Sequence, residues 1–216
     1  MSTLTLSGLL AAGDWGPYAA LMEGFHSWRH YGLFSHTLTT LNTSVLYQSG
    51  LHGQGHVERT LLLGALLGWM EDLTAEDSSL LLPAVSYHDV GRIDDGYDTE
   101  HGTRSAMRLG ELTGALGEEL LLMQGAVAAH SRPDERLEET VASYHAADCA
   151  HALTLARLLK DADGLDRVRI QDLNPDYLRH ESAKALTFFA QYLFDQYCAL
   201  GAACLPHWCT QKKPWA

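Results

Sequence analysis

The residues of this chain that could do chemistry centre on a histidine and an aspartate that stand side by side, His88 and Asp89, directly after a mostly apolar run. An imidazole nitrogen and a carboxylate oxygen together make a good ligand pair for a divalent metal ion. His56 lies upstream and Asp163 downstream, and they add the same two donor types. Two imidazoles and two carboxylates would leave open positions on an octahedral ion, where water and a phosphate oxygen can bind.

Two further histidines, His101 and His130, could bind a second metal ion or serve as acid–base and phosphate-binding groups. The alternative for His101 is a solvent-facing residue at a helix start, and for His130 it is an interaction with a helix C-terminus. Arg92, and also Arg104 or Arg108, could neutralise a phosphoryl group with a planar guanidinium fork. These side chains predict a phosphate-binding environment around the metal ligands.

The acidic segment 160–167 leaves a choice of ligand. Asp161 could replace Asp163, but an offset of two residues points elsewhere on a helix, so we expect Asp161 to orient a histidine instead. Asp166 and Arg167 are expected to pair or to cap the helix. We expect His52 to be a loop histidine, with a substrate contact as the alternative.

Periodic apolar residues predict that helices position these side chains. Thr74, with Asp77 three residues later, predicts a capping box, and Gly91 predicts a helix C-cap. No segment alternates with a period of two, so we expect an all-α bundle of about seven to nine helices. The main predicted helices cover residues 56–73, 74–89, 101–112, 118–130, 137–163 and 181–200.

The charge balance limits the class of partner. The chain has 15 Lys and Arg against 27 Asp and Glu, so no basic surplus favours binding to long nucleic acid. A small phosphorylated substrate stays compatible, because a bound cation can supply positive charge locally. The sequence has no signal-peptide pattern and no run of about twenty apolar residues, so we expect a cytoplasmic protein without a membrane partner. The oligomeric state stays open.

Four segments carry a resemblance to a known family. The order His, His-Asp, Asp, together with these segments, resembles the HD-domain superfamily of metal-dependent phosphohydrolases, in its bacterial stand-alone form. Position 92 holds Arg where many members have Lys, which keeps the charge. The segments are LHGQGHVER at 51–59, EHGTRSA at 100–106, AHS at 129–131 and KDADGLD at 160–166.

The resemblance implies a fold, a ligand set and a domain organisation. The fold would be the all-α HD-domain helical bundle, with an N-terminal helical extension at 1–47, the HD core at 48–170, and a C-terminal helix and tail packed on the core at 171–216. One or two divalent ions (Mn, Fe, Mg, Ni, Co or Zn) would bind per chain. The first ion would be held by His56, His88, Asp89 and Asp163, and the second by His101 and His130.

The implied function is hydrolysis of a phosphomonoester or phosphodiester, expected to be a nucleotide, through a metal-activated water. His101, His130 and Arg92 would be the catalytic groups. The Gly-Tyr-Pro signature is missing near His130, which disfavours the cyclic-dinucleotide phosphodiesterase subgroup. Two alternatives stay open: a non-catalytic HD signalling or binding module, and a di-iron oxygenase of the same fold.

Overall fold

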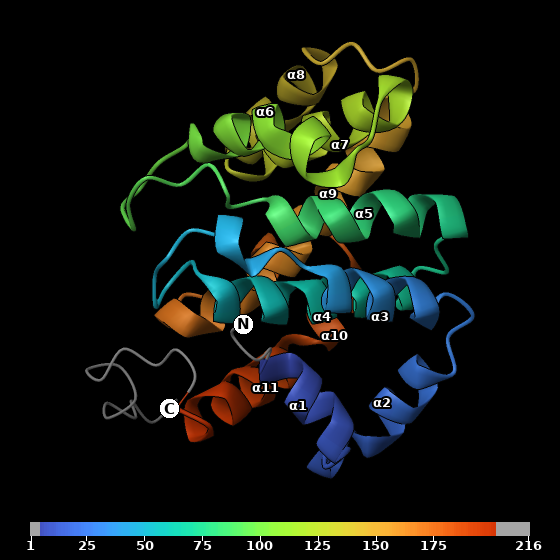
Figure 1. Cartoon of the computed structure of the whole chain (residues 1–216), viewed down its shortest axis with the longest axis vertical. Coiled ribbons are helices and arrows are strands. Elements are labelled where there is room, and N and C mark those ends of the chain that lie inside the picture. The colour runs from blue at the N-terminus through green and yellow to red at the C-terminus, as the bar shows by residue number, and fades with distance from the viewer. Residues whose placement is uncertain (1–4, 202–216) are drawn as a thin grey trace.

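The structure, a computed structural model, describes residues 5–201 and contains no strand within that range. The predicted all-α fold is therefore confirmed (Figure 1). The α-helices of the described range outnumber the seven to nine expected, because two predicted helices are divided and the N-terminal segment contains three. The α-helices are α1 (Thr5–Ala12), α2 (Ala19–His26), α3 (Tyr31–Thr40), α4 (Gln54–Met70), α5 (Ala75–Tyr87), α6 (His101–Thr113), α7 (Gly117–His130), α8 (Leu137–Ala142), α9 (Cys149–Leu165), α10 (Glu181–Ala185) and α11 (Thr187–Ala199).

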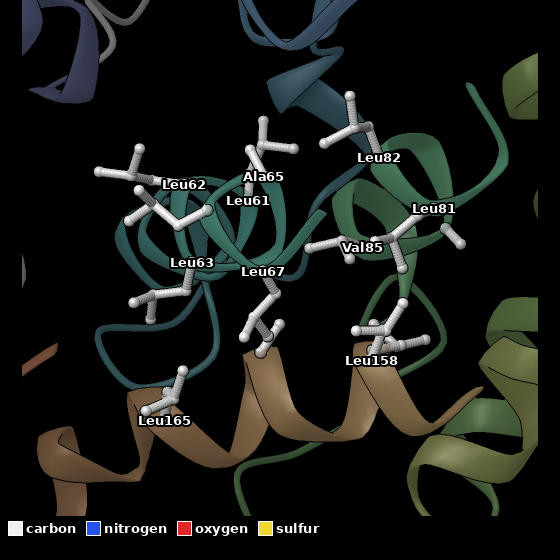
Figure 2. Packing of buried hydrophobic residues seen from close by; sticks show 14 of the residues in the cluster. Leu61, Leu62, Leu63, Ala65, Leu67, Leu81, Leu82, Val85, Leu158 and Leu165 are labelled. Carbon is white, nitrogen blue, oxygen red and sulfur yellow. The ribbon is translucent and has the colours of Figure 1, made fainter. Parts of the chain in front are cut away.

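Helix α4 forms the centre of the molecule. Every residue from His56 to Gly68 is buried, although the sequence predicted only one apolar face. The reason is that α5 and α9 cover one side of α4, while α1, α3, α10 and α11 contact the others. Figure 2 shows Leu63 and Leu67 of α4 directed toward α9, which presents Leu158 and Leu165. A helix that is surrounded in this way buries apolar side chains around its whole circumference.

Two predicted helices are divided by turns. The segment 137–163 forms α8 and α9, because the chain between them turns at His145, which has a φ of 58°. A residue in the left-handed region cannot continue an α-helix. The segment 181–200 forms α10 and α11, which meet at Leu186. The predicted tail after residue 201 lies outside the described residues.

Helix α5 brings His88 and Asp89 to the centre of the fold. Its N-terminus has the predicted capping box between Thr74 and Asp77. The helix ends at Tyr87, with His88 as C-cap, so the prediction that Gly91 caps it is wrong. Gly91 instead permits a close approach of α6, because a Cβ there would lie 2.5 Å from the carbonyl oxygen of His101.

Replacing Gly91 by alanine should therefore destabilise the fold by about 1–3 kcal/mol, the usual cost of overpacking a tight contact. Thermal unfolding of the variant measures the effect. Gly8→Ala in α1 is the matched control, because nothing lies within 4 Å of a Cβ at that position, and alanine raises helix propensity there by up to about 1 kcal/mol. Equal stability of Gly91→Ala and wild type would contradict the close approach.

The terminal segments are joined to α4 by a buried carboxylate. Glu58 Oε2 accepts hydrogen bonds from the Leu6 backbone nitrogen (2.7 Å) and from the Tyr197 hydroxyl (2.9 Å). Glu58 Oε1 accepts one from the Gln54 amide at 2.6 Å. These bonds tie α1 and α11 to the centre of the bundle. No helix in the described range is long and apolar enough to cross a membrane.

Candidate metal centre

Helix ends bring the six predicted site residues together. His56 lies in the first turn of α4, Asp163 in the last turn of α9, and His88 and Asp89 directly follow α5. His101 begins α6, and His130 ends α7. Five helices thus contribute to one cluster, although its members lie up to 107 residues apart in the sequence. That these residues bind a metal stays a prediction.

The first part of the cluster, here called the first group, consists of His56, His88 and Asp163. The Nε2 atoms of the two histidines lie 3.0 Å apart. Asp163 Oδ1 lies 3.4 Å from His56 Nε2 and 3.9 Å from His88 Nε2. These three donor atoms are close enough to one another to hold a single metal ion.

The second group consists of His101 and His130, whose Nε2 atoms lie 2.9 Å apart. Asp89 lies between the two groups. Its Oδ2 is 3.5 Å from His56 Nε2, and its Oδ1 is 3.0 Å from His101 Nε2 and 3.5 Å from His130 Nε2. One carboxylate therefore offers an oxygen to each group, which is the arrangement that two neighbouring metal ions would share.

All four histidines have the same tautomer. His56 Nδ1 contacts a carboxylate oxygen, while Nδ1 of the other three contacts a backbone carbonyl. These partners can only accept a hydrogen bond, so each Nδ1 carries a proton, and in the neutral form that binds metal each ring has a bare Nε2. The partners are Asp166 for His56 (2.7 Å), Val85 for His88 (2.7 Å), Asp98 for His101, and Val127 for His130 (2.5 Å).

With this tautomer, the neutral rings are arranged as ligands of a metal ion and not as hydrogen-bond partners of one another. Bare Nε2 atoms face one another at 3.0 Å in the first group and at 2.9 Å in the second, where two lone pairs repel each other. Asp89 Oδ1 is buried and accepts no hydrogen bond from a described residue. A buried polar atom without a partner is costly. A cation between these atoms would remove both penalties, so the residues present fit one or two divalent ions.

Burial keeps two of the imidazoles, those of His88 and His130, in the neutral form that binds metal. It lowers the pKa of His88 to about 3 and also lowers the pKa of His130. Burial alone would raise the pKa of Asp163, but the charge of Arg169 outweighs it and holds this pKa well below its usual range. His88 and His130 are therefore neutral and Asp163 is ionised at physiological pH.

Asp166 supports His56 from behind, a role that the sequence analysis did not predict. Its Oδ2 accepts from His56, and both of its oxygens accept from Arg59, at 2.6 and 2.9 Å. Burial would raise the pKa of Asp166, but the Arg59 guanidinium lowers it to about 2. Arg167 pairs with Asp172 and not with Asp166, but the other expected role is confirmed, because Asp166 is the C-cap residue of α9. In the sequence, the signal that could have indicated the support of His56 is the last aspartate of the segment KDADGLD, which is Asp166.

The three candidate arginines have different positions. Arg92 donates from Nε to Asp89 Oδ2 at 2.9 Å and so lies at the cluster. Arg104 donates to the Gly91 carbonyl and Arg108 to the Val90 carbonyl. These two arginines thus hold the backbone after the His-Asp pair, rather than lying free beside the cluster.

Asp161 does not compete with Asp163 as a ligand. Both of its oxygens accept hydrogen bonds from Arg179 and His180. It therefore orients a histidine, as expected, but one outside the cluster. His52 is buried and its Nδ1 lies 2.9 Å from Asp95 Oδ1, which makes it more than a solvated loop residue.

The comparison with known families agrees with this geometry. A sequence model described as the HD domain matches residues 53–168, more than half of the chain. The chain belongs to the HD domain family. No curated protein and no solved structure gives a significant match. The HD region contains all six clustered residues, together with Asp166 and Arg59.

Proposed function

We propose that this HD protein is a divalent-metal-dependent phosphohydrolase that acts on a small phosphomonoester or phosphodiester, with a nucleotide as the expected substrate. The observation that carries the proposal is the position of Asp89, whose two oxygens face two adjoining groups of Nε2 atoms. Membership of the HD family supports a hydrolase of this kind. Two neighbouring ions are a common arrangement in enzymes that cleave phosphate esters.

The ligand residues would define where the reaction occurs. One ion would be held by His56, His88 and Asp163, and the second by His101 and His130. Asp89 would contribute an oxygen to each ion. A divalent cation, when bound, polarises a phosphoryl oxygen and lowers the pKa of a coordinated water. Asp166 fixes the His56 ring through Nδ1, so that Nε2 stays directed at the site.

Arg92 would contribute charge to the same site. Its bond to Asp89 Oδ2 places a guanidinium beside the first group, where it can neutralise charge on a phosphoryl oxygen. If only the first group binds an ion, His101 or His130 would be free to move a proton between substrate and solvent through Nε2. The small number of basic residues in the whole chain favours a small substrate over long nucleic acid.

The test combines metal analysis with a substrate screen. Elemental analysis of the purified protein should find one or two equivalents of divalent metal. With Mn, Mg, Co, Ni, Zn or Fe supplied, the protein should hydrolyse p-nitrophenyl phosphate, its bis-ester or a nucleotide, and a chelator should reduce the rate to background. His36→Ala is the control, because His36 is an exposed residue of α3 and its loss should leave rate and metal content unchanged.

Three outcomes would contradict the proposal. A protein that takes up no metal after reconstitution would be a non-catalytic HD module. A metal-loaded protein that cleaves no phosphoester would refute hydrolysis. A redox-active di-iron centre with oxygen-dependent turnover would indicate the oxygenase alternative, which the same nitrogen and carboxylate donors could also support.

A further inference from the structure

Arg169 is a buried cation beside the first group that no described residue fully satisfies. It lies in the 3₁₀ helix Asp166–Ile170, directly after α9. Its Nη2 is 3.8 Å from Asp163 Oδ1 and its Nη1 is 3.6 Å from Asp166 Oδ2, both beyond hydrogen-bond distance. Its Nε and Nη1 are buried and donate to no described atom. Unpaired buried donors of a charged group carry a large desolvation cost.

A purely structural role does not account for this arrangement. Asp166 already receives two hydrogen bonds from Arg59, so it needs no second arginine. Asp163 is a predicted metal ligand, and a guanidinium next to it would repel a bound cation rather than help to hold it. An anion bound beside the metal would compensate the charge of Arg169.

Solvent reaches the cluster at Asp163, the residue that Arg169 approaches. The Asp163 side chain is 27% exposed, whereas those of the other five clustered residues are at most 5% exposed. Arg92 contacts Asp89 Oδ2, the oxygen that faces the first group. Burial, followed by the charges of Arg169 and Arg92, lowers the pKa of His52 to about 4.

We infer that Arg169 binds the phosphoryl group of the substrate, with Arg92, which contacts Asp89, as a second cation beside the first group. This role rests on the proposed phosphohydrolase function and names a residue that neither the sequence motifs nor the family match includes, since the match ends at residue 168. A guanidinium offers parallel N–H donors whose spacing matches two oxygens of one phosphate. The substrate phosphate would satisfy Nε and one Nη.

The test measures binding of inorganic phosphate to metal-loaded protein by isothermal titration calorimetry, with metal content determined on the same samples. Arg169→Gln should weaken phosphate binding by about 10- to 100-fold, the loss expected when hydrogen bonds to a charged group are removed, while metal content stays at the wild-type level. Arg169→Lys should recover part of the affinity, because it restores the charge but not the fork. Arg157→Gln, at an exposed arginine of α9 whose one ion pair with a described residue is to Glu138 at 3.7 Å, should bind phosphate like the wild type.

Each outcome has a definite meaning. Unchanged phosphate affinity in a folded, metal-loaded Arg169→Gln protein overturns the inference and leaves the proposed function intact. If that variant does not fold, Arg169→Met tests the same loss, because an apolar side chain of similar length often tolerates burial in place of a charge. Failure of both variants to fold or to hold metal would assign Arg169 a structural role and overturn the inference. Metal-loaded wild-type protein that binds no phosphate would contradict the proposed function itself.

Discussion

Asp89→Asn should abolish activity and strip the protein of most of its metal. The substitution keeps the shape of the side chain but removes the negative charge that faces both groups, at 3.5 Å from His56 Nε2 and 3.0 Å from His101 Nε2. We expect kcat/KM to fall by at least about a thousandfold, which corresponds to about 4 kcal/mol of transition-state stabilisation. Bound metal should fall about tenfold or more, as measured by elemental analysis after dialysis.

The matched control is Asp94→Asn in the loop between α5 and α6. Asp94 is exposed and accepts a hydrogen bond only from the Gly96 backbone nitrogen among the described residues, so its loss should change neither metal content nor rate. A fully metal-loaded and active Asp89→Asn protein would show that the cluster is not the metal centre. Loss of one of two ions would show that Asp89 supports only one group.

Asp166→Ala should have two separable effects. It leaves the fully buried Arg59 without its carboxylate, and a buried charge that loses its partner destabilises a protein by about 3–5 kcal/mol. It also frees Nδ1 of His56, and loss of such a supporting hydrogen bond weakens metal binding about 10- to 100-fold. Urea unfolding of metal-free protein measures the first effect, and metal titration measures the second.

A second substitution separates the two effects. Arg59→Met combined with Asp166→Ala removes the unpaired charge, so stability should recover in part while metal affinity stays low. Asp172→Ala is the control, because its ion pair with Arg167 is exposed and should contribute less than about 1 kcal/mol. Recovery of both properties in the double variant would contradict the support of His56 by Asp166.

The same carboxylate makes stability depend on pH. The pKa of Asp166 is lowered from 3.8 to about 2 in the folded state, so its ionised form stabilises the fold above pH 3.8. This contribution should be lost as the pH falls toward 2, because the folded protein must then bind a proton that the unfolded chain binds more readily. Acid unfolding of metal-free protein should show this component in the wild type and lack it in Asp166→Ala.

Sequence patterns predicted the helical class and the approximate extent of most central helices, because apolar periodicity and caps are local signals. The capping box at Thr74 is one such signal, and the structure has it. The division at His145 was not predictable, because its positive φ depends on how α8 and α9 pack rather than on a glycine in the sequence. Burial around the whole of α4 depends equally on segments that are distant in sequence.

At the site, residue type and spacing were enough to nominate the six clustered residues, which the structure brings together. They could not reveal how Asp166 and Arg59 contribute, because that contact joins α4 to the end of α9 across 107 residues. The same holds for Arg169. The sequence does not reveal whether an arginine is solvated or is buried without a partner, because this depends on the residues that pack around it in the fold.

The recognisable family segment is shorter than the unit that must fold together. Glu58 stands two positions after His56, and its carboxylate is held by Leu6 and Tyr197, which both lie outside the matched residues 53–168. Arg59, beside it, lies with its guanidinium 5.1 Å from the ring centres of Phe194 and Tyr197. Transplanting this HD core into another member of the family would therefore require moving its terminal helices as well, because an excised core would leave both charges without their natural surroundings.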